Sequence, residues 1–371
     1  MFLANRQGVE RLGEFELAMS VLGLVPFVFV TGSNVLFVRE VKSGTWGRFY
    51  AMCSQIFILT LGLGVVIVLA LYSKGKIGIL DVVLLLTLIA LTYWIRIGTT
   101  ILQSIRQPHH FFLGDNNFSN VVMLALSGGI FGSIYADILL AKLCVAFAIC
   151  LLLIKVSRPS LKEVSFRIFQ NTGLTAELVR SGVFFFLKSL TAGGLIFMVS
   201  FSASIAEVGI LGVLMRVANI AGLGLVLLSP KYAVDIANAS SYDFIGKELD
   251  KVRKMSLTFA LLCFLGVVLL SQQILAFWGV AEIYGEALIW IVGGQVVNAC
   301  VGPVGILMAK EEKFDLLILF VSISLTLFLL FVLFWPTDSL VQRVAVGVFA
   351  MQVIDNALKY CWWAWRKFDS K

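Results

Sequence analysis

Apolar runs of twenty or more residues recur along the whole 371-residue chain, separated by short segments that contain charges, Pro or Gly. A helix rises about 1.5 Å per residue, so about twenty apolar residues cover the roughly 30 Å of hydrocarbon in a bilayer. Hydrophobic residues make up 60% of the sequence and charged residues only 14%, a balance that is foreign to water-soluble domains. The sequence therefore predicts an all-α, polytopic transmembrane helix bundle.

The apolar runs predict about eleven spans in two groups, divided by a polar and basic segment. The first group comprises residues 14–38, 50–72, 78–104, 110–131 and 133–155. The second comprises residues 178–201, 206–236, 254–278, 286–308, 313–335 and 340–364. We therefore expect an N-terminal transmembrane lobe at 1–155, a cytoplasmic linker at 156–177, and a C-terminal transmembrane lobe with a cytoplasmic tail at 178–371.

The charges in the loops predict the orientation of these spans. If successive loops alternate sides, one side carries twenty Lys and Arg residues and the other carries five. The basic side of a membrane protein faces the cytoplasm, so we expect the C-terminus inside and the short N-terminus outside. Residues 240–254 mix charges with sparse apolar positions, which is typical of a short helix on the cytoplasmic surface or of a solvated loop.

A weak internal repeat links the two lobes. A shift of 196 residues aligns Gly13 with Gly209 and Met19 with Met215, with apolar positions matching between them. In this register the span at 178–201 has no partner in the first lobe, so we hypothesise that relatives possess a first helix that precedes residue 1. An in-frame apolar segment in the upstream coding DNA would test this. Two homologous lobes around an axis along the membrane normal are a recurrent plan of transporters, with the substrate path between them.

Three segments resemble a known family: residues 8–15 (GVERLGEF), residues 208–230, which run from VGIL through RVAN to LSP, and residues 294–303 (GQVVNACVGP). Together they are similar to Wzx-type O-antigen repeat-unit flippases of the MOP exporter superfamily. The resemblance implies a two-lobed transporter in the bacterial inner membrane that flips undecaprenyl-diphosphate-linked oligosaccharides from the cytoplasmic to the periplasmic leaflet by alternating access. It also implies a role in lipopolysaccharide or other surface polysaccharide, with membrane lipids and other polysaccharide-assembly proteins as partners. A multidrug or toxin exporter of the same superfamily is the alternative.

Four basic residues lie inside the predicted spans, where a charge costs about 2.5–3.5 kcal/mol on insertion scales and usually faces a wet cavity. Lys188 and Arg216 are near mid-span, Arg96 is toward the cytoplasmic end and Lys142 toward the outer end. Such cations suit a diphosphate, which they bind through charge-assisted hydrogen bonds. Alternatively, Lys188 or Arg216 pairs with Asp355 and locks helices together, and Arg96 snorkels to the interface.

Polar residues at helical spacing extend this candidate site. Asn219 shares a helix face with Gly212 and Arg216, and Gln295 shares one with Asn298 and Gly302. We expect these faces to line a central cavity. The alternative is that the amides bridge packed helices. Asp355 is the acidic residue nearest mid-membrane and is a candidate site for a coupling proton or sodium ion.

Other function classes lack support in the sequence. The six cysteines lie singly in apolar runs and His109 and His110 are adjacent in one loop, so no metal site is expected. There is no Walker motif, and the basic loops fit membrane orientation better than nucleic-acid binding, so neither a cofactor nor nucleic acid is expected. No large outer loop or nucleophile–base pair occurs, so we expect no enzyme; a membrane-embedded polysaccharide polymerase is the enzymatic alternative.

Overall fold

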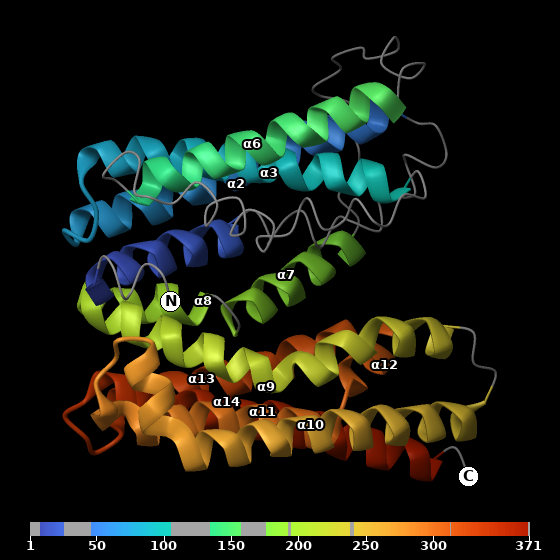
Figure 1. The fold of residues 1–371 in the computed structure, drawn as a ribbon. Helices are drawn as coiled ribbons and strands as arrows, with labels where there is room; N and C mark the ends of the chain where they lie inside the picture. The colour runs from blue at the N-terminus through green and yellow to red at the C-terminus, as the bar shows by residue number, and fades with distance from the viewer. Residues whose placement is uncertain are drawn as a thin grey trace. The chain divides into compact units, whose positions relative to one another are not determined.

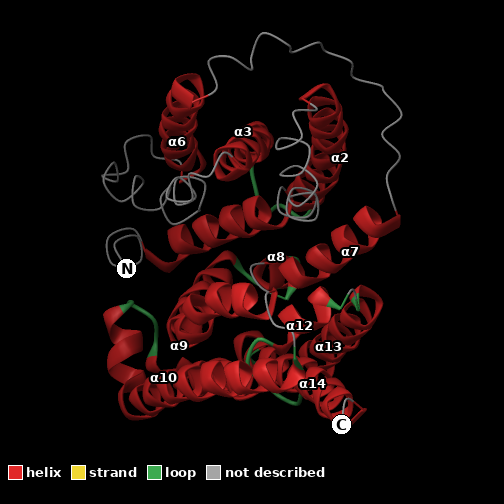
Figure 2. Ribbon diagram, turned by 90° about the vertical axis from the view of Figure 1, so that its right-hand side faces the viewer, coloured by secondary structure: helices red, strands yellow, loops and turns green. Residues whose placement is uncertain are grey.

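The protein is all helical in the part of the chain that the structure describes. The computed structural model describes residues 8–25, 46–104, 134–156, 176–191, 194–237, 241–311 and 313–369. Within these ranges helices are joined by short turns and no strand occurs (Figures 1 and 2). This confirms the predicted all-α, polytopic helix bundle.

Seven of the described helices are long and apolar enough to cross a membrane. They are α2 (Trp46–Ser73), α3 (Ile79–Ser104), α9 (Ile205–Ala237), α10 (Tyr242–Phe277), α11 (Gly285–Val301, extended by the preceding turn η3, Glu282–Tyr284), α13 (Phe314–Phe334) and α14 (Leu340–Asp369). Helix α6 (Ile134–Val156) coincides with the span predicted at 133–155. The span predicted at 110–131 lies outside the described residues.

The chain divides into two compact units. Residues 14–201 form one, called here the N-terminal unit, and residues 1–13 with 202–371 form the other, the C-terminal unit. The helix over residues 8–25 begins in the C-terminal unit and ends in the N-terminal unit. Helices α7 (Ala176–Leu190) and α8 (Gly194–Ser200) cluster with the N-terminal unit, whereas the sequence prediction assigned 178–201 to the second lobe. The division of the two lobes at the linker 156–177 therefore stays a prediction.

In the C-terminal unit, α11 is the central helix, because it contacts α9, α10 and α14, while α13 packs on α14. Its interior positions Leu288, Ile291 and Val292 are fully or almost fully buried. The outer helices instead expose large apolar side chains, such as Leu262 of α10 and Phe334 of α13. An apolar outer surface around a packed centre is what a bundle solvated by lipid requires.

In the N-terminal unit, α2 and α3 form an antiparallel hairpin, and α6 packs on α3. Gly75 adopts a φ of 67° in the connecting turn, a left-handed conformation that glycine adopts without strain, and its N–H donates to Tyr72 O. Asp81 follows at the start of α3 and accepts a hydrogen bond from Gly78 N at 3.0 Å. The turn thus satisfies backbone groups at both helix ends.

Residues 240–254 were predicted as a separate surface helix or a loop, and this prediction was wrong. Residues 242–254 form the first turns of α10, whose helix continues from Tyr242 into the apolar span. Ser241 caps the helix by accepting from Phe244 N, and Tyr242 Oη donates to Glu311 Oε1 at 2.6 Å. Arg366 of α14 pairs with the other oxygen of Glu311 at 3.3 Å. Polar contacts to neighbouring helices, which the sequence pattern does not reveal, therefore hold these turns in line with the span.

Two predicted spans are broken helices. In the span at 178–201, α7 ends at Leu190 and α8 begins at Gly194, and the span at 286–308 consists of α11 and α12 (Val304–Lys310). The second break lies at Gly302, where φ is 74°, and at Pro303, which has no N–H to continue the helix. Broken spans are a recurrent feature of transporter folds.

Candidate functional site

The four basic residues predicted to line a transport path lie in both units. Lys188 on α7 is exposed, Arg96 on α3 is half-buried with a buried Nε, and Lys142 on α6 is only 1% exposed. All three belong to the N-terminal unit, whereas the half-buried Arg216 on α9 belongs to the C-terminal unit. Because Lys188 and Arg216 belong to different units, their convergence on one path stays a prediction.

The predicted polar face in the C-terminal unit lies on helices that contact one another. Asn219 of α9 is exposed, and Gln295 and Asn298 of α11 are half-buried. The Gln295 side chain covers Gly222 of α9, since a Cβ added to Gly222 would lie 2.9 Å from Gln295 Oε1. Gln295 therefore packs against α9 at Gly222, and whether it also lines a cavity stays a prediction. Asn219, on the same helix, points away from the packed interior.

Asp355 forms an ion pair that was not among the predicted alternatives. Its Oδ2 accepts a charge-assisted hydrogen bond from Lys359 Nζ, one turn further along α14. The Asp355 and Lys359 side chains are 14% and 10% exposed. Asp355 Oδ1 is buried and accepts no hydrogen bond within the described part of the chain, so it keeps acceptor capacity.

Sequence reasoning missed two buried ionisable residues. Lys359 is 8% exposed, although it had been counted with the cytoplasmic loops near the end of the span 340–364. Glu16 is 6% exposed and lies only two residues inside the predicted span 14–38. The ends of predicted spans are uncertain by several residues, and a charged residue near such an end is normally assigned to the membrane interface. Both residues were therefore missed.

Arg253 of α10 fills the break between α11 and α12. Its Nε donates to Cys300 O at 2.7 Å, a carbonyl in the last turn of α11, and its Nη1 pairs with Asp250 at 3.2 Å. Its guanidinium also lies 5.7 Å from the centre of the Tyr360 ring on α14. A Cβ added to Gly302 would lie 2.6 Å from Arg253 Cγ. The break is therefore a packed and hydrogen-bonded bend, and its helix-end carbonyl at Cys300 is satisfied by the arginine.

We expect Arg253→Ala to destabilise the protein by about 1.5–3 kcal/mol, the range for hydrogen bonds to charged groups, because Cys300 O loses its donor. The neighbouring Lys254→Ala is the matched control, since that side chain is exposed, and such changes usually stay within about 0.5 kcal/mol. The measurement is the unfolding free energy of both purified variants in the same detergent. Equal stabilities would contradict a structural role for the arginine.

Two glycines in equivalent positions of the predicted repeat make a reciprocal contact. A Cβ added to Gly13 would overlap Ile205 O, and a Cβ added to Gly209 would overlap Val9 O. Residues 9 and 205 are separated by the same 196 positions as residues 13 and 209. The added Cβ of Gly209 would also lie 2.9 Å from Gly13 N, so the two backbones touch. When two helices contact each other through equivalent residues, the contact has local twofold symmetry.

No group of three or more His, Cys, Asp or Glu side chains suited to a metal ion occurs among the described residues. The six cysteines are free thiols. His109 and His110 lie outside the described ranges.

Comparison with solved structures finds the same fold in MATE transporters. A multidrug resistance MATE family transporter of the MOP superfamily in its inward-facing conformation matches with a TM-score of 0.64 and 17% identity, over 96% of this chain and 90% of that one. A MATE in complex with MaL6 matches with a TM-score of 0.55 and 15% identity, over 97% and 88% of the two chains. No family model and no curated protein matches the sequence.

Proposed function

We propose that this chain is a multi-pass transporter of the bacterial inner membrane that flips undecaprenyl-diphosphate-linked oligosaccharide units to the periplasmic leaflet by alternating access. The fold that it shares with MATE transporters supports transport as the activity. The reciprocal contact of Gly13 and Gly209 supports a two-repeat plan, in which two similar halves rock about a common site. In this proposal the C-terminus is cytoplasmic, and other membrane proteins of polysaccharide assembly supply and use the cargo.

The proposal of an anionic cargo rests on the exposed Lys188. It lies on α7, inside the predicted span 178–201, and no carboxylate pairs with it among the described residues. A lysine in a span is stabilised by water or by an anion, and in functional cases it faces a wet cavity. A diphosphate offers several charged oxygens to such an ammonium group.

The cargo is tested by measuring lipid-linked repeat units in cells that lack the gene. We expect the units to accumulate on the cytoplasmic side and wild-type protein to clear them. Lys188→Ala should lower the clearance roughly 10- to 100-fold, because a charge-assisted hydrogen bond contributes about 1.5–3 kcal/mol. Lys188→Arg should retain most activity, since it keeps the charge.

The matched control is Lys313→Ala, which removes an exposed lysine at the start of α13. It should clear the units like wild type. If deletion of the gene leaves surface polysaccharide intact and raises drug sensitivity, the flippase proposal is wrong. A multidrug exporter then replaces it. The free acceptor oxygen of Asp355 favours that second candidate, because a buried carboxylate suits a proton or a cationic drug.

A further inference from the structure

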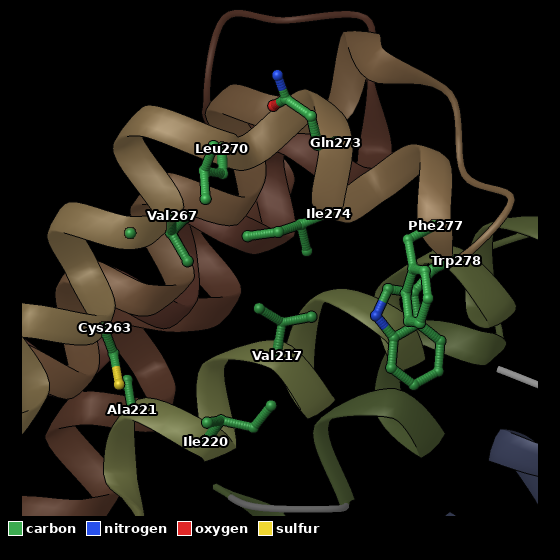
Figure 3. A pocket seen from close by; sticks show the side chains of 11 residues that line it. Val217, Ile220, Ala221, Cys263, Val267, Leu270, Gln273, Ile274, Phe277 and Trp278 are labelled. Atoms are coloured by element: carbon green, nitrogen blue, oxygen red, sulfur yellow. The ribbon is translucent and has the colours of Figure 1, made fainter.

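The C-terminal unit contains an apolar groove of about 540 Å³ between α9 and α10 (Figure 3). One face of α9, which includes Val217 and Ala221, forms one wall. A stripe of α10 from Cys263 past Ile274 forms the other wall, and Trp278 lies at its end. These positions follow helical spacing on both helices, so the groove runs along the two axes.

The groove is a wedge that closes at one end. At the closed end the helices touch, because a Cβ added to Gly224 of α9 would lie 3.3 Å from Phe259 Cβ and from Ser256 Cα of α10. Further along α10, a Cβ added to Gly266 would meet nothing within 4 Å, so the helices have separated. Leu270 then departs from helical geometry, with φ −124° and ψ 18°, and this kink continues the divergence.

The surface around the groove is one that hydrocarbon covers. Leu262, Leu265 and Leu269 of α10 are 65%, 54% and 68% exposed, and they lie in a helix apolar enough to span the membrane. An open groove continuous with such a surface is filled by hydrocarbon, because an empty one forfeits dispersion contacts along its walls. From Cys263 to Trp278 the helix makes 15 steps of about 1.5 Å, or roughly 22 Å. One leaflet of hydrocarbon is about 15 Å deep, half of the bilayer core.

The open end carries a hydrogen-bond donor. Figure 3 shows the indole nitrogen of Trp278 on the side of its ring that faces the other lining residues. Within the described part of the chain this N–H donates to no protein acceptor, whereas the backbone N–H of Trp278 bonds to Ile274 O and Leu275 O. Tryptophan is enriched at membrane interfaces, where its ring is apolar and its N–H meets polar groups.

We propose that this groove is a lipid site that holds one acyl chain of a membrane phospholipid, with an ester carbonyl of that lipid accepting a hydrogen bond from Trp278 Nε1. The closed end at Gly224 receives the chain terminus and the open end at Trp278 receives the polar head. A long polyprenyl chain would extend far past a groove of roughly 22 Å, so phospholipid is the occupant that fits. The site is independent of which cargo the protein carries.

Native mass spectrometry of the protein released from detergent micelles tests the site. Wild type should retain an adduct of phospholipid mass, and Gly266→Phe, which fills the groove, should lose it. Gly62→Phe on α2 is the matched control, since a Cβ there also meets nothing within 4 Å but lies outside the groove, and it should keep the adduct. Equal retention of the phospholipid adduct in both variants, or a wild-type adduct of polyprenyl mass that Gly266→Phe abolishes, would overturn the proposal.

A second measurement does not depend on a variant that fills the groove. In nanodiscs of phospholipid with brominated acyl chains, the fluorescence contributed by Trp278, taken as the difference between wild type and Trp278→Phe, should be strongly quenched. Adding polyprenyl phosphate should leave this quenching unchanged. Unquenched Trp278 emission, or quenching that polyprenyl phosphate relieves, would show that no phospholipid chain occupies the groove.

Discussion

Alanine at Gly13 or at Gly209 is expected to destabilise the protein by at least about 1–3 kcal/mol, the usual range for overpacking. The added methyl group would overlap a backbone carbonyl oxygen in each case, Ile205 O or Val9 O. A flexible side chain could move aside, but backbone can yield only if one helix shifts. Because the contact is reciprocal, we expect the two variants to lose similar amounts of stability.

The control lies on the same helix. Gly23 is ten residues beyond Gly13, and a Cβ added there would meet nothing within 4 Å. Gly23→Ala should therefore stabilise the helix, by about 0.5–1 kcal/mol, because glycine is a poor helix former. The measurement is the unfolding free energy of the three variants in one detergent. A stabilised Gly13→Ala would mean that the close approach of the two helices does not exist.

The same substitution also bears on transport. If the two repeats rock during alternating access, the Gly13–Gly209 contact belongs to a state in which these helix ends are closed together. A larger side chain at either position raises the free energy of that state, so the population shifts away from it. Transport should fall even in variants that remain folded, and Gly23→Ala should transport like wild type.

The sequence predicted this contact only in part. The 196-residue shift aligned Gly13 with Gly209, and the structure brings these two glycines into contact. The shift gave no distance between them, since an internal alignment says which turns are alike and not which turns touch. The apolar runs located α2, α3, α9 and α13 closely, because a bilayer demands about twenty apolar residues wherever a helix crosses it.

Predictions from the sequence failed where local polar contacts override the hydrophobic pattern. The start of α10 reads as a polar segment, yet Tyr242 and Glu311 hold it as helix. Gly302 and Pro303 did carry a signal for the broken span, because this dipeptide rarely continues a helix. No sequence signal indicated that Lys359 is buried, since a lysine five residues from a predicted span end cannot be distinguished from an interfacial one.

Removing one partner of the Asp355–Lys359 pair is expected to cost about 3–5 kcal/mol, because the charge that remains loses a hydrogen-bonded counter-ion at an almost buried position. Asp355→Asn and Lys359→Met should each show this loss. The double variant should recover most of it, since apolar or neutral replacement of a whole buried pair is often close to neutral. Single-variant losses that simply add in the double variant would show that the two side chains do not interact in the native state.

The double variant also separates a structural from a functional role of Asp355. If the carboxylate only locks α14, restoring stability with Lys359→Met in the Asp355→Asn background should restore transport as well. If Asp355 binds the coupling ion through its free Oδ1, the double variant should be stable and inactive, because an amide cannot take up a proton at neutral pH and binds a cation more weakly than a carboxylate. Since both single variants lose stability under either role, transport by the stable double variant is the measurement that decides between them.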